Sequence, residues 1–197
     1  MARKKPKVIP FRRKREQKTH YKKRLKLLTS KRTRLVFRRY NNTFLGQFIA
    51  YKPEGDTIVS VVNSSELRKL GWSHSCGNIS AAYLTGLLLG KKGLDRKVKD
   101  AILDIGMHHS VAGSRIYAFA KGVVDSGVDV PVSEEVFPSE ERLSGAHIVA
   151  ISEKASGSQF SKLKKDKIDP KKISADFEKV KKKILELDTK KTKDKKW

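Results

Sequence analysis

The chain of 197 residues has a single cysteine, Cys76, so it cannot form an intramolecular disulfide, and a reducing compartment is its expected environment. Long hydrophobic runs are also missing. A membrane-spanning helix needs about 20 consecutive apolar residues, and the densest apolar stretch, residues 84–89, is short and interrupted by Gly86. The first residues lack the apolar segment of a signal peptide. These absences predict an intracellular soluble protein.

Acidic residues are scarce as well, with 21 Asp and Glu against 45 Lys and Arg, which gives a formal net charge of +24. Residues 1–39 hold 18 bases and one acid, residues 40–150 hold 11 bases and 12 acids, and residues 151–197 hold 16 bases and 8 acids. A neutral middle segment therefore lies between two basic extensions. A field this strong attracts polyanions, either nucleic acid or an anionic membrane surface.

The two extensions differ in the kind of base they carry. The first has nine Arg and nine Lys, whereas the last 47 residues contain no Arg. Arg presents a planar fork that holds phosphates in fixed geometry, while Lys is a hydrated point charge on a flexible stem. We therefore expect the first extension to be ordered on its partner and the last to act more diffusely.

The order of the predicted elements indicates an α/β domain with a mixed sheet and flanking helices. Alternating β-branched and aromatic residues between turn signals predict strands at 34–39, 44–51, 57–62 and 99–105. Helical spacing and capping residues predict helices at 18–28, 63–71, 79–89, 114–127 and 174–187. Residues 130–148 are expected to run irregularly over the surface, and residues 1–10 and 190–197 to lack regular structure.

For three of these elements the sequence allows more detailed predictions. In the first strand, Leu35 and Phe37 should face the core while Arg34, Val36 and Arg38 face the other way, which gives the sheet a basic face. In the first helix, Tyr21, Leu25 and Leu28 form a thin apolar stripe that could pack on the domain. Gly90 and Gly93 are expected to end the helix that begins after Asn78.

The densest functional signal is residues 10–25, where Arg and Lys can neutralise a phosphate backbone while Phe11, His20 and Tyr21 stack on exposed bases or sugars. The alternative interpretation is a charge-only localisation signal or solvated tail. A second anion site is possible at Gly113-Ser114-Arg115, where a helix begins, and an ordinary serine cap beside a surface arginine explains that sequence equally well.

Other chemistries lack the residues they need. His74 with Cys76, and the pair His108-His109, do not supply the four ligands of a zinc site, so we predict no metal and no cofactor. The stretch 86–92 lacks the spacing and hydroxyl of a phosphate-binding loop. A nuclease would need several converging carboxylates, and Asp104 on a buried strand is better interpreted as structural.

Nine stretches in order along residues 8–150, with a weaker continuation to about residue 184, together resemble one family. They are FRRKRE (11–16) with KTHY (18–21), RLKLL (24–28), ELRKLGW (66–72), CGN (76–78), AAYLTGLL (81–88), AILDIG (101–106), GSR (113–115), FPSE (137–140) and GAHI (145–148). The sequence resembles the large-subunit ribosomal protein called L-eighteen in archaea, whose eukaryotic counterpart is L-five.

This resemblance implies a ribonuclease-H-like fold without a nuclease site. It implies a structural, non-enzymatic ribosomal protein of the cytoplasm that binds 5S rRNA and anchors it to 23S-type rRNA in the central protuberance, next to other ribosomal proteins. No membrane and no small-molecule substrate are expected. A nuclease and a general nucleic-acid compacting protein remain the alternatives. We expect three parts: a basic RNA-binding arm at 1–30, an α/β core at 31–150 and a lysine-rich extension at 151–197 with one amphipathic helix.

The predicted RNA-binding residues come from the arm, the basic face of the sheet and three loops. They are Phe11, Arg12, Arg13, Lys14, Arg15, Lys18, Thr19, His20, Tyr21, Lys22, Lys23, Arg24, Arg32, Arg34, Arg38, Asn41, Asn42, Trp72, Asn78, Ser114 and Arg115.

Overall fold

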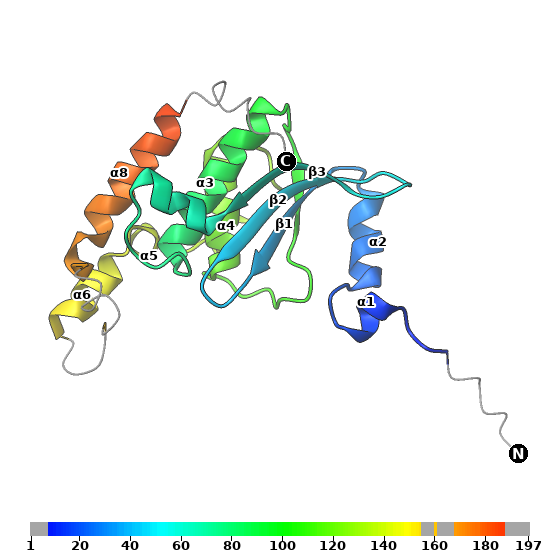
Figure 1. Ribbon diagram of the computed structural model, residues 1–197, viewed down its shortest axis with the longest axis horizontal. Helices are drawn as coiled ribbons and strands as arrows, with labels where there is room; N and C mark the ends of the chain where they lie inside the picture. The colour runs from blue at the N-terminus through cyan, green and yellow to red at the C-terminus, as the bar shows by residue number, and fades with distance from the viewer. Residues whose placement is uncertain (1–7, 155–159, 161–167, 188–197) are drawn as a thin grey trace, which may run out of the picture.

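The computed structural model describes residues 8–154, 160 and 168–187. Its centre is one four-stranded mixed sheet in the order β3-β2-β1-β4 (Figure 1). The strands are β1 (Thr33–Arg39), β2 (Phe44–Ala50), β3 (Thr57–Asn63) and β4 (Ala101–Asp104). β1 pairs antiparallel with β2 and parallel with β4, and β2 pairs antiparallel with β3. The α/β class and the mixed sheet predicted from the sequence are confirmed, while a ribonuclease-H-like relationship stays a prediction.

Among the described elements, the long helices cover one face of this sheet, and two short N-terminal helices lie beyond the other (Figure 1). Two short helices, α1 (Arg12–Arg15) and α2 (Tyr21–Thr29), precede it, and the 3₁₀ helix η1 (Ser64–Leu70) follows β3. The long helices α3 (Ile79–Asp95) and α4 (Arg115–Asp125) pack on the sheet, and α8 (Ile173–Glu186) lies on the far side of α3 (Figure 1). The remaining elements are η2 (Glu134–Val136), α5 (Glu140–Ser144), α6 (Ala146–Lys154) and η3 (Pro170–Lys172).

The core lies between the sheet and the helix pair. Leu35 and Phe37 of β1 are fully buried on this side together with Phe44 and Phe48 of β2, and the Phe37 ring lies 5.0 Å from that of Phe119 on α4. The alternation predicted for the first strand is therefore confirmed. Because the inward positions are apolar, Arg34, Val36 and Arg38 are placed on the opposite face of the sheet, the one turned toward the N-terminal arm.

The prediction that Gly90 and Gly93 end a helix was wrong, since α3 continues to Asp95. Gly90, together with Gly86, lies where α3 packs closely against α4. A Cβ atom at Gly86 would lie 2.1 Å from the Phe119 carbonyl oxygen, and one at Gly90 would lie 1.8 Å from Ser126 Oγ. The contacts move in the same direction along both helices, from Gly86–Phe119 to Gly90–Ser126, so α3 and α4 run parallel. Both helices therefore begin at the same end of the molecule.

The C-terminal elements also differ from expectation. Residues 130–148 are not irregular throughout, because they contain η2, α5 and the start of α6, and Leu143 of α5 is buried. The final helix begins at Ile173, and Ser174 does not cap it. Its apolar residues Ile173, Phe177, Val180 and Ile184 join the main core. The predicted unstructured end, residues 190–197, lies outside the described residues, as do residues 1–7 at the start.

Candidate nucleic-acid interface

The basic arm folds back on itself before it reaches the sheet. α1 consists of Arg-Arg-Lys-Arg with no buried residue, and Gln17 follows it in a left-handed conformation with a φ of 52°. The Arg13 Nε donates to Thr19 Oγ1 at 2.9 Å, which closes the turn. α2 then begins at Tyr21 behind His20, whose Nδ1 accepts the backbone N–H of Lys23 at 3.2 Å. The Phe11 and Tyr21 rings lie 5.5 Å apart on this arm.

The expectation that an apolar stripe docks α2 on the domain was wrong. Tyr21 is 39% exposed and Leu25 is 68% exposed, and none of the nine residues of α2, all of which the structure describes, is buried. α2 is connected to the domain through Arg24. Its guanidinium donates two hydrogen bonds to Asp56, in the turn between β2 and β3, at 2.8 and 2.9 Å.

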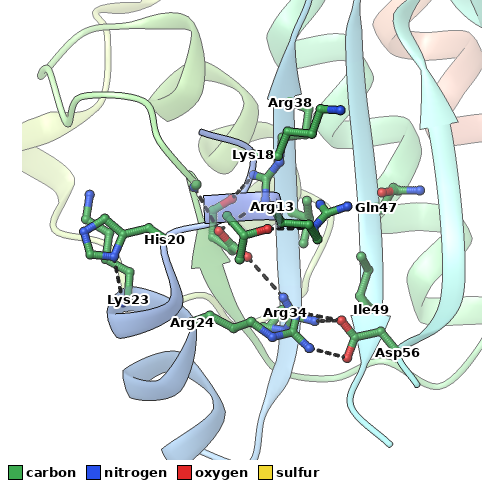
Figure 2. Close-up of a pocket in the computed structure, with 14 residues that line it drawn as sticks. Arg13, Lys18, His20, Lys23, Arg24, Arg34, Arg38, Gln47, Ile49 and Asp56 are labelled. Atoms are coloured by element: carbon green, nitrogen blue, oxygen red, sulfur yellow. Dashed lines mark hydrogen bonds and ion pairs between the residues drawn. The ribbon is translucent and has the colours of Figure 1, made fainter. Parts of the chain in front are cut away.

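Asp56 is the first member of a chain of ion pairs that crosses the face of the sheet opposite α3 and α4 (Figure 2). Its Oδ2 also accepts a bond of 2.5 Å from Arg34 on β1, and Arg34 donates at 3.2 Å to Asp104 on β4. Arg38 lies 3.5 Å from the other Asp104 oxygen and donates to the Asp104 carbonyl at 3.1 Å. The hydrogen bonds from Arg24, followed by those from Arg34, lower the pKa of Asp56 below its usual range, so this carboxylate stays ionised at neutral pH.

Arm and sheet together enclose a cleft of about 210 Å³. Figure 2 shows His20 and Lys23 of the arm at the left, Gln47 and Ile49 of the sheet at the right, and the arginines of arm and sheet between them. Eight predicted RNA-binding residues line the cleft: Arg13, Lys18, Thr19, His20, Lys23, Arg24, Arg34 and Arg38. It also contains residues that sequence reasoning missed, namely Val36, Gln47, Ile49, Asp56, Asp104 and Gly106.

Of the three arginines of β1, Arg34 and Arg38 line the cleft, and these two differ in accessibility. The Arg38 side chain is 34% exposed, whereas that of Arg34 is only 4% exposed and is paired with two carboxylates. His108 lies near Arg38 and Arg39. Burial, and then the positive charges of Arg39 and Arg38, lower the pKa of His108. Arg38 is therefore the more accessible of the two cleft arginines, and Arg34 shares the Asp104 carboxylate with it. Arg39 is exposed at the end of β1 and does not line the cleft.

A second group of predicted residues meets at one end of the sheet, where α3 and α4 begin. Arg115, the first residue of α4, donates to the Gly77 carbonyl at 2.9 Å. A Cβ at Gly77 would lie 3.3 Å from the Asn42 carbonyl oxygen, which places the β1–β2 turn against the same loop. The turn residues Asn41 and Asn42 are exposed, and Asn78 caps α3 through a 2.7 Å bond to Ala81 N. Three separate chain segments therefore meet at this end of the sheet, beside the N-termini of α3 and α4.

The other predicted residues lie apart from the cleft. Trp72 is 1% exposed and donates its indole N–H to the Ser75 carbonyl at 3.1 Å, so it supports the 72–78 loop from inside. Arg32 is exposed and pairs at 3.6 Å with Asp100. The exposed arm residues that do not line the cleft are Phe11, Arg12, Lys14, Arg15, Tyr21 and Lys22.

Asp104, the nuclease candidate, and His74, one of the candidate metal ligands, both have structural partners. Asp104 accepts from Arg34 and from the Gly106 N–H at 2.9 Å, so its oxygens hold the strand end and the cleft arginines together. His74 is buried and lies 3.1 Å from Asp176 of α8. Among the described residues, no group of three or more His, Cys, Asp or Glu side chains could hold a metal ion.

A family model described as "Ribosomal large subunit proteins 60S L5, and 50S L18" matches residues 5–101 of the chain. The chain belongs to this family. The matched segment contains the arm, the three antiparallel strands, η1, α3 and the first residue of β4, so it spans most of the cleft. The family resemblance drawn from the sequence motifs is thereby confirmed over residues 5–101, and the motif stretches after residue 101 stay a prediction.

Membership makes the chain a ribosomal large-subunit protein, a class of structural proteins whose surroundings are rRNA and other ribosomal proteins. An rRNA-binding role agrees with the basic cleft, since polyphosphate attracts closely spaced cations. No helix among the described residues is long and apolar enough to cross a membrane.

Proposed function

We propose that this ribosomal protein binds 5S rRNA and anchors it to 23S-type rRNA in the central protuberance of the large subunit, without catalysing a reaction. The observation that carries the proposal is the cleft between arm and sheet. Six of its fourteen lining residues are Arg or Lys, they come from both the arm and β1, and two acids hold part of them in place. Phosphates bound there would meet cations with a defined spacing.

The arm supplies both kinds of contact that RNA recognition uses. Its lysines and arginines are exposed, which suits phosphate neutralisation, and Phe11 and Tyr21 present partly exposed rings close together. The group at the β1–β2 turn and the starts of α3 and α4 is a second proposed contact region, in which Asn41, Asn42 and Arg115 face a polyanion. In this proposal Arg34 and Trp72 support neighbouring residues instead of contacting RNA, because they have almost no exposed surface.

The three-part organisation also stays a proposal, with residues 1–30 as the arm, 31–150 as the core and 151–197 as the extension. In the structure, part of the C-terminal extension packs against the core. α8 belongs to the extension by sequence, yet its apolar face is buried in the core together with Tyr83 and Leu84 of α3. We therefore assign RNA contact to the arm and core, and a packing role to α8.

The test is filter binding of the purified protein to 5S rRNA and to a scrambled RNA of the same length and composition, at low and high salt. The proposal predicts tighter binding to 5S rRNA at both salt concentrations, because screening weakens charge-only attraction more than fixed contacts. Equal affinity for the two RNAs would favour a general compacting protein. Magnesium-dependent RNA cleavage by the pure protein would contradict the non-catalytic role.

A further inference from the structure

An acidic residue lies at the centre of this basic surface, although its negative charge weakens the attraction of the surface for RNA. The connection between β2 and β3 carries two acids, Glu54 and Asp56, only two residues apart. Asp56 lines the cleft, and Glu54 does not. Each of these carboxylates reduces the positive potential that attracts RNA, so a selective reason is needed for the one inside the cleft.

The geometry of Asp56 supplies that reason. Both of its oxygens accept from the Arg24 guanidinium, at 2.8 and 2.9 Å, in the bidentate arrangement that fixes the relative orientation of the two groups. The same Oδ2 accepts from Arg34 at 2.5 Å. Arg24 belongs to α2 of the arm and Arg34 to β1 of the sheet, so one carboxylate joins three separate segments of the chain (Figure 2).

Apolar burial contributes little to this connection. None of the nine described residues of α2 is buried: Tyr21 and Leu25 are exposed, and Leu27 and Leu28 are only partly buried. A short isolated helix of this length is marginal in water without tertiary contacts. The Asp56 carboxylate is therefore the main described attachment of α2 to the sheet.

We propose that Asp56 is a positioning residue of the RNA-binding surface, which holds the basic arm over the sheet in the free protein so that RNA meets a preformed cleft. This inference rests on the proposed function, and it deepens it by naming the residue that orders the site. Ordering the arm before binding removes an entropy cost that a flexible arm would pay on contact with RNA.

The sign of the effect separates positioning from charge. Asp56→Asn removes one negative charge and so raises the net charge of the surface by one. Charge alone therefore predicts equal or tighter binding to every RNA. Positioning predicts the reverse for the specific RNA, because α2 loses its attachment and two arginines lose a shared partner. Binding to unrelated RNA should stay the same or rise slightly.

Glu54→Gln is the matched control, since it changes the charge by the same amount in the same turn, and Glu54 is exposed and forms no ion pair with any described residue. By filter binding we expect Asp56→Asn to weaken 5S rRNA binding about tenfold, which is the scale of losing charge-assisted hydrogen bonds, and Glu54→Gln to leave it unchanged. Arg24→Lys keeps the charge but breaks the bidentate pair, and it should weaken binding in the same direction.

A measurement without RNA keeps the two proposals apart. Hydrogen exchange of the α2 amides in the free protein should be faster in Asp56→Asn than in the wild type or Glu54→Gln, with α3 exchange unchanged as evidence of an intact core. Unchanged α2 exchange, or equal 5S rRNA affinity for the two variants, would overturn the positioning role alone. A wild type that does not prefer 5S rRNA would overturn the proposed function, and the positioning role with it.

Discussion

At the scale of single residues, the arginines of this protein divide by the partners around them. Arg38 keeps about a third of its side chain exposed, whereas the side chain of Arg34 is 4% exposed between Asp56 and Asp104. A buried charge is tolerated when it is paired and hydrogen-bonded, and removing one partner leaves an uncompensated ion in a low-dielectric environment. Arg34 thus acts as an internal connection in a surface that is otherwise cationic and open.

This gives a stability prediction for Asp104. Asp104→Asn keeps the shape of the side chain but removes the charge that faces Arg34 at 3.2 Å, and we expect a loss of about 2–4 kcal/mol in the free energy of unfolding. Asp100→Asn is the control, because Asp100 is half-exposed in its 3.6 Å pair with Arg32 and should cost less than about 1 kcal/mol. Urea unfolding of both variants measures the difference. Similar losses would mean that the buried pair contributes no more than an exposed one.

At the scale of elements, packing against α4 explains the glycines within the long helix α3. Gly86 and Gly90 both lie on the side of α3 that meets α4, where a methyl group would collide with the Phe119 backbone and the Ser126 side chain, respectively. Glycine lowers helix propensity, and the close contact between two parallel helices offsets that cost. The glycines therefore belong to the helix–helix interface and mark no end of the helix.

We predict that Gly86→Ala destabilises the fold although alanine is the better helix former. The added Cβ would lie 2.1 Å from the Phe119 carbonyl oxygen, which is backbone and cannot rotate away, so the helices must separate. Overpacking of this kind costs about 1–3 kcal/mol, more than the roughly 1 kcal/mol gained in propensity. Thermal or urea unfolding checks the sign. A stabilised variant would show that the α3–α4 contact is looser than the structure has it.

The strands and the basic face were predictable from sequence, because alternation along a strand is a local pattern that burial on one face imposes. β1 illustrates this, with Leu35 and Phe37 inward and Arg38 outward. The end of α3 was not predictable, since the role of Gly90 depends on its contact with Ser126 at the end of α4, far along the chain. The docking of α2 was mispredicted for the same reason. The apolar stripe of α2 can be seen in its own sequence, whereas the carboxylate that attaches α2, that of Asp56, lies in a turn distant in the sequence.

The candidate site divides in the same way. The exposed bases of the arm could be identified from composition, because dense Arg and Lys with interleaved aromatics is itself the signal. Gln47, Ile49 and Asp56 carried no such signal. They enter the cleft only because the sheet pairs β1 with β2 and the turn after β2 reaches back to Arg24.

At the scale of the whole molecule, positive charge is present on two sides that the core separates. α2 lies beyond one face of the sheet, while α8 packs on the far side of α3, so the sheet and the α3–α4 pair stand between them (Figure 1). Both helices carry exposed lysines, among them Lys22, Lys23 and Lys26 on α2 and Lys179 and Lys182 on α8. A formal net charge of +24 attracts RNA from any direction, and only the bound face releases counterions from specific phosphates.

This arrangement predicts which lysines set the salt dependence of binding. Changing Lys22, Lys23 and Lys26 to Gln should flatten the slope of log K against log salt by roughly 2, since each lost phosphate contact removes about 0.7–0.9. The matched control changes Lys172, Lys179 and Lys182, three exposed lysines of η3 and α8, and removes the same charge from the opposite side of the core. Its slope should stay near that of the wild type, because those lysines contact no phosphate in the proposed complex. Filter binding to 5S rRNA at four or more salt concentrations gives both slopes. Equal flattening in the two triple variants would mean that RNA responds to the net charge of the molecule and that the arm is not the bound face.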